Sequence, residues 1–347
     1  MFQNSQFELT LTLDSDKFGK IFDQAYNTLY SSLEFFDEDK YVDHTFTPKG
    51  LTVIYCDSQY KKKIKLIVNS CQLLDTDKPN PDKLISKLNK RIERYFNNKY
   101  QLDDFELSGM GVTVDIDVRS SEKVFDYLKV LRRIGKVKGF SPSSNNNWPD
   151  NDTGLCYDGN SNGIKFMLYD LDFLTSEQSS DVCFSEGQIS SETYFSTGQS
   201  SDKYCNIGQP EYSEGILRAE VRLTKPKAIR AYTNKSSTSK QIAHLHDNRQ
   251  QIFLDTFMKI IPFGNFYKKD KAEEAIRTKV KDATIGRKML WLVGLIPEKK
   301  SLLSAQKALN ERRIDKVMKA FFDIEVAPIT ISKRHDVKKL DNLYSYL

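Results

Sequence analysis

The sequence is poor in the residues that build disulfide frameworks or thiolate metal sites. Only five cysteines occur among 347 residues, at Cys56, Cys71, Cys156, Cys183 and Cys205, and none belongs to a CxxC pair. Their odd number and wide scatter argue against a disulfide framework and against a thiolate zinc site.

Histidine is equally scarce, with four residues in the chain. Two of them, His244 and His246, form the HxH of AHLHDNR, and on a strand this alternate spacing would place both on one face. A metal site is one interpretation. The polar flanks favour the other, a solvated segment.

Long apolar runs are also missing. No uninterrupted run approaches the roughly 20 residues that a bilayer-spanning helix needs. The first residues, MFQNSQFELTLTLDSDKF, lack a basic region followed by an apolar stretch, so no signal peptide is evident. We therefore expect a cytoplasmic protein that does not enter a membrane.

Charge is present in quantity and is unevenly distributed. The net charge of +5 conceals a basic part, because residues 216–347 hold 28 Lys and Arg against 14 Asp and Glu. A basic region of this size predicts a polyanionic partner, and nucleic acid is the most common one. The alternative is a charged helical surface that binds nothing.

The periodicity of apolar residues predicts alternating groups of strands and helices. Alternation or β-branched runs predict strands at residues 7–15, 50–58, 62–74, 110–120, 163–172 and 215–232. Helical spacing predicts helices at residues 17–36, 80–100 and 121–135 and over most of the chain from 238. Turn residues predict a loop with one brief strand at 141–163, and the Ser-rich segment 175–215 is predicted to be an insertion or covering loop.

This order predicts an α+β fold with a central, mainly antiparallel sheet and flanking helices. We expect two domains. Residues 1–235 would form the first, including the Ser-rich segment, and residues 236–347 would form a basic, mostly helical second part.

Three predicted strands carry polar side chains on one face. The polar sets are Thr113, Asp115 and Asp117 in GVTVDIDV, Lys165, Met167 and Tyr169 in IKFMLYD, and Arg218, Glu220 and Arg222 in LRAEVRL. If the strands are neighbours, the carboxylates suit a hard cation such as Mg²⁺ or Mn²⁺, which would polarise a phosphodiester.

On such a face Tyr169 could be a nucleophile, although a phenol with an ordinary pKa near 10 needs activation. Simpler interpretations also exist. Asp115 and Asp117 could be solvated, and Tyr169 could be an ordinary strand aromatic. Arg218 and Glu220 could serve merely as ion-pair partners of each other or of neighbouring residues.

The order VDIDV, GNSNGIKFMLYD and GILRAEVRL resembles the replication initiation factors of rolling-circle plasmids and phages of Gram-positive bacteria. Members of that family commonly have an acidic strand R-x-D-x-x-x-D, a strand ending in Y-D-K, and a strand R-x-E-x-R. The segments YLKVLRRIGKVKGFSP and FFDIEVAPITISKR are similar to those of phage-type members, and the resemblance covers most of residues 50–347.

The resemblance implies a relaxase-like nicking domain and a metal-dependent, site-specific DNA endonuclease that cuts and rejoins a replication origin. Tyr169 matches the tyrosine that becomes joined to the 5′ phosphate. Asp115 and Glu220 match metal ligands, with Asp117 a further candidate. Two further residues, Arg218 and Arg222, match cations that hold the scissile phosphate.

Two positions depart from the family pattern. Leu171 stands where a lysine is expected after Tyr-Asp, so that Lys165 is the candidate for the missing cation. Gly111 stands where the first aspartate of the acidic motif is expected. Because of these departures, a DNA-binding protein that cannot nick DNA is an open alternative. A conjugative relaxase with the same chemistry is a second alternative.

The basic C-terminal part is predicted to contain one amphipathic helix at 270–296, two short helices before residue 325, and a strand with a basic turn at 326–336. This pattern is compatible with a winged helix-turn-helix and equally with a helical bundle. The predicted DNA contacts are Arg312, Arg313, Lys316, Lys333 and Arg334. The expected partner is a single-stranded or hairpin replication origin. The resemblance also implies a host helicase and a host polymerase. The oligomeric state is open, and a homodimer is one possibility.

Overall fold

The computed structural model describes most of the chain. The described residues are 5–14, 33–37, 40–43, 50–58, 61–76, 78–143, 153–160, 163–172, 214–310, 312 and 314–347. The predicted loop at 175–215 and the middle of the loop at 141–163 therefore lie largely outside them.

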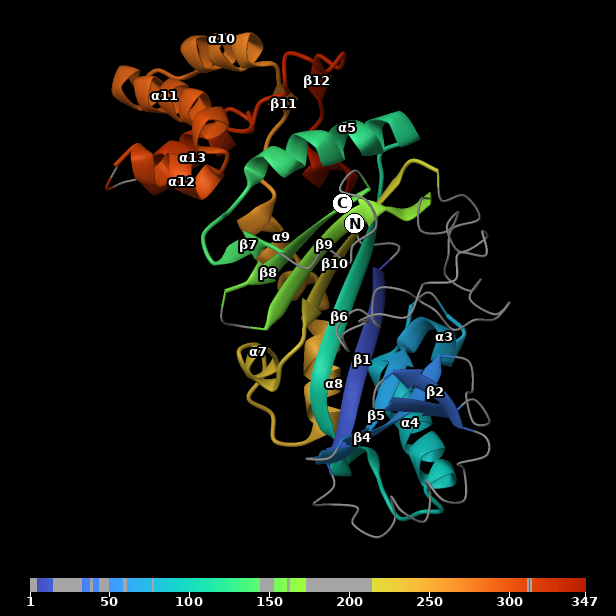
Figure 1. Ribbon diagram of the computed structural model, residues 1–347. Helices are drawn as coiled ribbons and strands as arrows, with labels where there is room; N and C mark the ends of the chain where they lie inside the picture. The colour runs from blue at the N-terminus through green and yellow to red at the C-terminus, as the bar shows by residue number, and fades with distance from the viewer. Residues whose placement is uncertain are drawn as a thin grey trace.

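A ten-stranded antiparallel sheet forms the centre of the described structure (Figure 1). Its strands run in the order β2-β3-β4-β5-β1-β6-β10-β9-β8-β7. Their bounds are β1 Ser5–Asp14, β2 Leu33–Asp37, β3 Lys40–Asp43, β4 Leu51–Ser58, β5 Lys61–Asn69, β6 Glu106–Asp117, β7 Phe140–Pro142, β8 Gly154–Gly159, β9 Ile164–Asp170 and β10 Ile216–Leu223. The N-terminal strand β1 joins the two halves of the sheet because it pairs with β5 on one side and β6 on the other.

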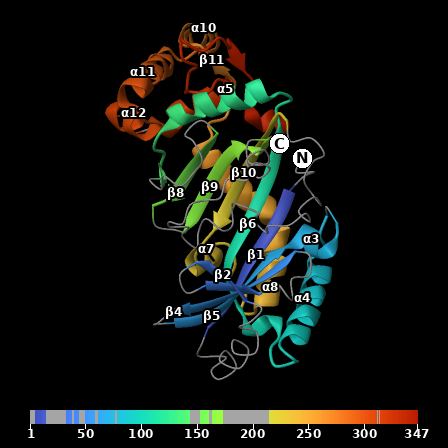
Figure 2. The same cartoon turned by 45° about the vertical axis from the view of Figure 1, so that its right-hand side comes forward.

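One face of the sheet is apolar and is covered by helices α4 (Pro81–Tyr95), α8 (Thr238–Asp247) and α9 (Arg249–Ile260), which lie behind the strands in Figures 1 and 2. Helix α8 packs on β6 and on α4, and α9 packs on β10. Alternate strand residues point into this layer, so the side chains of Phe7, Leu9, Leu11 and Leu13 of β1 are fully buried.

Short helices complete this part of the molecule. Helix α3 (Ser70–Leu74) follows β5, and α5 (Ser121–Leu131) contacts β9 and β10. The remaining short elements are the 3₁₀ turns η1 (Leu102–Asp104) and η2 (Arg132–Ile134) and helix α7 (Pro226–Arg230).

The C-terminal residues form a helical group beyond one end of the sheet (Figure 1). Its elements are β11 Phe266–Tyr267, α10 Lys269–Lys279, α11 Ala283–Lys299, α12 Leu302–Ala308, α13 Ile314–Asp323, β12 Lys339–Leu340 and η4 Leu343–Tyr346. β11 and β12 pair as a second, two-stranded sheet.

The predicted fold class is confirmed: the protein is α+β, with an antiparallel sheet flanked by helices. The local signals behind it are visible in α4, which begins with Pro81 after Asn80. The Asn80 Oδ1 accepts hydrogen bonds from the backbone N–H groups of Asp82 and Lys83, as expected for an N-cap. The predicted helix at 121–135 is found as α5 followed by the 3₁₀ turn η2, and Gly135 follows this turn with a positive φ of 59°.

Three predicted elements in the first two thirds of the chain are wrong in part. The strand predicted for 62–74 ends at Asn69, because the Asn69 side chain caps helix α3, Ser70–Leu74, by accepting a hydrogen bond from the Gln72 N–H. Residues 33–36 were included in a helix, but they belong to β2, which pairs with β3; the rest of that segment lies outside the described residues. The strand predicted for 215–232 ends at Leu223, and Pro226 begins α7 because its fixed φ suits a first helical turn.

Two predicted elements of the C-terminal part also need correction. The single helix at 270–296 is two helices, and Asp282 caps the second with hydrogen bonds from Thr284 and Ile285. The segment 326–336 forms isolated bridges from Val326 to Asn265 and from Ile331 to Lys268 in place of a strand. The winged helix and the domain boundary at residue 235 stay predictions. Among the described residues, no helix has the length and apolar character to cross a membrane.

Candidate functional site

The three strands with polar residues on one face are neighbours in the sheet, in the order β6-β10-β9. Arg218 on β10 lies opposite Asp115 on β6 and opposite Tyr169 on β9. Glu220 lies opposite Thr113 and Met167. The strand adjacency that the sequence required for a common site is therefore confirmed.

These polar residues are buried, although they lie on the face opposite the helix-covered core. The exposed fractions are 8% for Arg218, 5% for Glu220, 5% for Arg222 and 3% for Tyr169. Buried charges are tolerated when they are paired and hydrogen-bonded, so the pairing of each group determines what the site can do.

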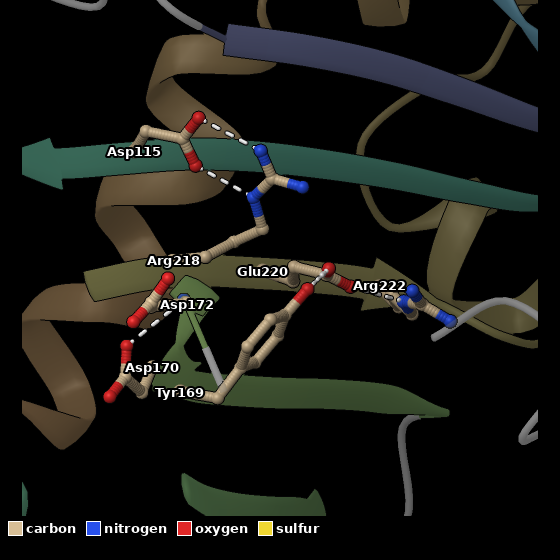
Figure 3. A network of polar contacts seen from close by, with 7 residues as sticks. All are labelled: Asp115, Tyr169, Asp170, Asp172, Arg218, Glu220 and Arg222. Atoms are coloured by element: carbon tan, nitrogen blue, oxygen red, sulfur yellow. Dashed lines mark hydrogen bonds and ion pairs between the residues drawn. The ribbon is translucent and has the colours of Figure 1, made fainter. Parts of the chain in front are cut away.

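Tyr169, Glu220 and Arg222 form a continuous chain of hydrogen bonds (Figure 3). The Tyr169 hydroxyl donates to Glu220 Oε1. The other carboxylate oxygen, Oε2, accepts from Arg222 Nε at 2.9 Å and from Nη2 of the same guanidinium. One oxygen of Glu220 therefore accepts the hydrogen bond of the phenol. The guanidinium of Arg222 binds the other oxygen and neutralises the charge of the carboxylate.

A second ion pair lies on the β6 side of the same face. Arg218 Nε donates to Asp115 Oδ1 at 2.7 Å and Nη2 donates to Oδ2 at 2.9 Å, which is a bidentate arrangement. Burial lowers the pKa of the Arg218 guanidinium, but the hydrogen bonds and charge of Asp115 raise it more, so its pKa lies above the ordinary value. Both arginines of the site thus stay cationic.

The surroundings of Tyr169 oppose its ionisation in this arrangement. Burial raises the pKa of the phenol well above 10, and the negative charge of Glu220 raises it further. The positive charges of Arg218 and Arg222 act in the other direction. The phenol donates its hydrogen bond to Glu220. This arrangement favours transfer of the phenol proton to Glu220 during the reaction, without a phenolate that forms beforehand.

Glu8 of β1 is a carboxylate at the site that the sequence did not reveal. It lies opposite Gly111 of β6. A Cβ atom on Gly111 would lie 3.9 Å from Glu8 Oε2 and from Arg222 Cγ, so Glu8 occupies the side of the face where residue 111 has no side chain. Burial raises the pKa of Glu8 to about 7, the charge of Arg222 lowers it and that of Glu220 raises it. Only the pairing register between β1 and β6 could have identified it.

The other predicted site residues lie at different distances from this centre. Lys165 lies on the same face opposite Arg222 of β10, four residues along β9 from Tyr169. Asp117 is exposed at the end of β6, where its Oδ1 accepts a hydrogen bond from the Arg119 backbone N–H. Leu171 is buried and supplies no cation.

The predicted metal ligands do not form a metal site as they stand. Both oxygens of Asp115 bind Arg218, and both oxygens of Glu220 are engaged by Tyr169 and Arg222. Within the described ranges, no group of three or more His, Cys, Asp and Glu side chains is arranged to hold an ion. Arginine guanidinium groups occupy the positions where a cation would neutralise these carboxylates.

The HxH pair lies on a helix and not on a strand. His244 and His246 belong to α8, where residues two apart point in directions roughly 200° apart, since each residue turns the helix by about 100°. His246 is buried, and its ring meets the edge of Phe7 with 5.4 Å between ring centroids. The shared-face prediction for this pair is therefore wrong.

Four of the five predicted DNA-contacting residues lie in the described C-terminal part, and Arg313 lies outside it. Arg312, Lys316, Lys333 and Arg334 are exposed. Lys316 is on α13, while Lys333 and Arg334 lie in the segment between α13 and β12.

Comparisons with known proteins give little to set beside this geometry. No protein-family model matches the chain, and no curated protein matches it. One solved structure, a rolling circle replication initiator protein from Geobacillus stearothermophilus, is similar over 95% of this chain and 98% of that chain, with 12% identity and a TM-score of 0.32. A similarity of this degree does not establish a common fold.

Proposed function

We propose that this chain starts rolling-circle replication by cutting and rejoining one DNA strand through Tyr169. The observation that carries the proposal is the hydrogen bond from the Tyr169 hydroxyl to Glu220, with Arg218 and Arg222 on the same strand as Glu220. A phenol, the carboxylate that accepts its hydrogen bond and two guanidinium groups share one sheet face, which supports phosphoryl transfer because these groups could act as nucleophile, proton acceptor and cations. The order of motifs along the sequence supports the same reaction.

The proposed reaction is a transesterification that conserves the number of phosphate bonds. The Tyr169 oxygen attacks phosphorus while Glu220 accepts the phenol proton, and the bond from phosphorus to the 3′ oxygen breaks. The products are a 5′-phosphotyrosine and a strand whose 3′ oxygen, once protonated, is a hydroxyl that a polymerase can extend. Arg218 and Arg222 stabilise the negative charge that develops on the phosphate oxygens. Rejoining is the reverse of the same steps.

The buried state of the site sets a condition on this reaction. Because Tyr169 is only 3% exposed, its hydroxyl must become accessible before a phosphodiester can reach it. The arginines must also turn at least one N–H group from a carboxylate to the phosphate. DNA phosphate can replace that carboxylate, because guanidinium groups bind both anions through two parallel hydrogen bonds.

Metal dependence remains a prediction from the family resemblance. The carboxylates are neutralised by arginines, so no step is assigned to an ion here, and a titration of nicking activity with Mg²⁺ and Mn²⁺ tests the point. The recognition of a single-stranded or hairpin origin, the host helicase and polymerase, a cytoplasmic location and a homodimer are likewise proposals.

The test mixes the protein with Mn²⁺ and a supercoiled plasmid that carries its coding region, and measures relaxed plasmid and covalent protein–DNA adduct. We expect the wild-type protein to give both. Tyr169→Phe should give neither, because it removes the nucleophile, while it retains DNA binding. The control Tyr267→Phe, on β11, should react like the wild type.

Wild-type adduct levels in Tyr169→Phe would place the nucleophile elsewhere. Absence of adduct in every variant, with DNA binding retained, would favour the nick-incompetent alternative. Cleavage at a transfer origin and not at a replication origin would identify a conjugative relaxase.

A further inference from the structure

A cavity of about 340 Å³ opens on the polar face of the sheet and is separate from the position of the Tyr169 hydroxyl. Residues of the neighbouring strands β5, β1, β6 and β10 line it. The lining side chains that bear on its chemistry are Thr10, Thr12, Lys63, Lys65, Ser108 and Arg222.

The cavity has a small excess of positive charge. Lys63 and Lys65 stand two residues apart on β5 and both line the cavity, and Arg222, whose guanidinium pairs with Glu220, is a third cation. Two carboxylates, Asp14 and Glu106, also line it, and Glu106 pairs with Arg230 at 3.7 Å. The balance of charge favours an anion.

Three hydroxyl groups line the cavity beside these cations, and two of them are hydrogen-bonded to each other. The Ser108 hydroxyl is 2.6 Å from that of Thr12 and 3.2 Å from the carbonyl oxygen of Thr10, which it donates to. The Thr10 hydroxyl is different: Thr10 is 5% exposed, and its Oγ1 has no hydrogen-bond partner in the described part of the chain. A buried hydroxyl without a partner in the wall of a basic cavity is a donor that an anionic ligand can satisfy.

The backbone leaves this space open through a bulge and two glycines. The pairing of β1 with β6 shifts register between Thr10 and Leu11, where Ser108 is the extra residue of β6. A Cβ atom on Gly109 would lie 3.0 Å from Thr10 Oγ1, which is too close for the two to remain in place. Gly109 therefore leaves room for the Thr10 hydroxyl.

We propose that this cavity binds a backbone phosphate of single-stranded DNA, several nucleotides from the phosphate that Tyr169 attacks. Tyr169 on β9 and Lys65 on β5 are four strands apart, which corresponds to about 19 Å at the usual strand spacing of roughly 4.8 Å. Arg222 connects the two places, since it lines the cavity and binds the carboxylate that accepts the Tyr169 proton. Binding at both places would fix the position of the scissile bond of the DNA strand relative to Tyr169.

This inference rests on the proposed function, but binding alone tests it. The assay measures the affinity of a short fluorescent oligodeoxythymidylate over a range of salt concentrations, using full-length protein with Tyr169→Phe so that no cleavage occurs. We expect Lys63→Gln with Lys65→Gln to lower the affinity about tenfold at low salt. The slope of log affinity against log salt should fall by about 0.7, because the contact to one single-stranded phosphate is lost.

Two further variants separate the cavity from general charge effects. Thr10→Val keeps the shape of the side chain and removes the hydroxyl, so it should lower the affinity severalfold with no change in the salt slope. Lys83→Gln with Lys90→Gln, which removes two exposed lysines from α4 behind the apolar face, should leave affinity and slope unchanged.

Equal slopes for the β5 and α4 double variants would overturn the proposal. It would also be overturned if the mononucleotide dTMP bound the cavity as tightly as the oligonucleotide, since the site would then serve a free nucleotide. The protein could show a salt slope that depends on Lys63 and Lys65 and yet form no adduct with any plasmid. That result would support phosphate binding in the cavity and reject the nicking function, so failure of one proposal can be told from failure of the other.

Discussion

At the scale of single residues, the site depends on how five charged side chains and one phenol are paired. Asp115 is committed to Arg218, and Glu220 is shared between Arg222 and Tyr169. Glu8 is the member of the set whose protonation changes near neutral pH, because burial raises its pKa to about 7.

The raised pKa of Glu8 predicts that the stability of the fold depends on pH. Its pKa in the folded protein lies above the ordinary value of 4.5, so the folded state binds the proton more tightly than the unfolded chain. The stabilisation is fully present below about pH 4.5 and is lost as the pH rises through about 7. Glu8→Gln should flatten the dependence of the free energy of unfolding between these values and make the protein more stable at pH 8 by up to about 3 kcal/mol.

Urea denaturation at a series of pH values measures this effect. Glu122→Gln, an exposed carboxylate on α5, is the control and should follow the wild-type curve. A Glu8→Gln curve parallel to that of the wild type would show that Glu8 titrates normally.

At the scale of elements, the sequence predicted what local patterns determine. Alternation in GVTVDIDV, IKFMLYD and LRAEVRL identified β6, β9 and β10 and the face that each polar residue occupies. It could not place β1 beside β6, because strand order depends on pairing between distant segments. Glu8 was missed for that reason.

The errors also have local physical causes. An apolar period continues through residues 270–296, so the break between α10 and α11 is invisible in hydrophobicity alone. Asp282 causes the restart, since its carboxylate accepts hydrogen bonds from Thr284 N at 2.8 Å and Ile285 N at 3.1 Å. The apolar period alone does not reveal this cap.

Asp282→Ala should therefore destabilise the protein by about 1 kcal/mol, the usual cost of losing a side-chain N-cap. A lower urea midpoint with an unchanged m-value would give this result. Asp336→Ala, at an exposed loop position, is the comparison. Equal midpoints for the two variants would mean that Asp282 contributes nothing to the start of α11.

At the scale of the whole molecule, a sheet with a buried polar face adjoins a basic C-terminal part. Residues 216–347 carry twice as many basic as acidic residues. If this part binds duplex DNA, Lys333→Gln with Arg334→Gln should lower affinity for all sequences alike. The salt slope should fall by about 1.8, as expected for two lost contacts to duplex phosphates.

The control for this experiment is Lys269→Gln with Lys271→Gln on α10, where the lysines pair with Glu273 and Glu274. Because those ammonium groups already have partners, the control should retain the wild-type slope. If both double variants lower the slope equally, binding depends on net charge and not on the segment between α13 and β12.

The central claim is that Tyr169 becomes joined to DNA. The most direct measurement is to digest the protein–DNA adduct with nuclease and protease and to identify by mass spectrometry the tyrosine that carries a nucleotide. We expect a nucleotide on the peptide that contains Tyr169 and on no other. A nucleotide on a different tyrosine, or none on any peptide under conditions in which the plasmid is nicked, would contradict it.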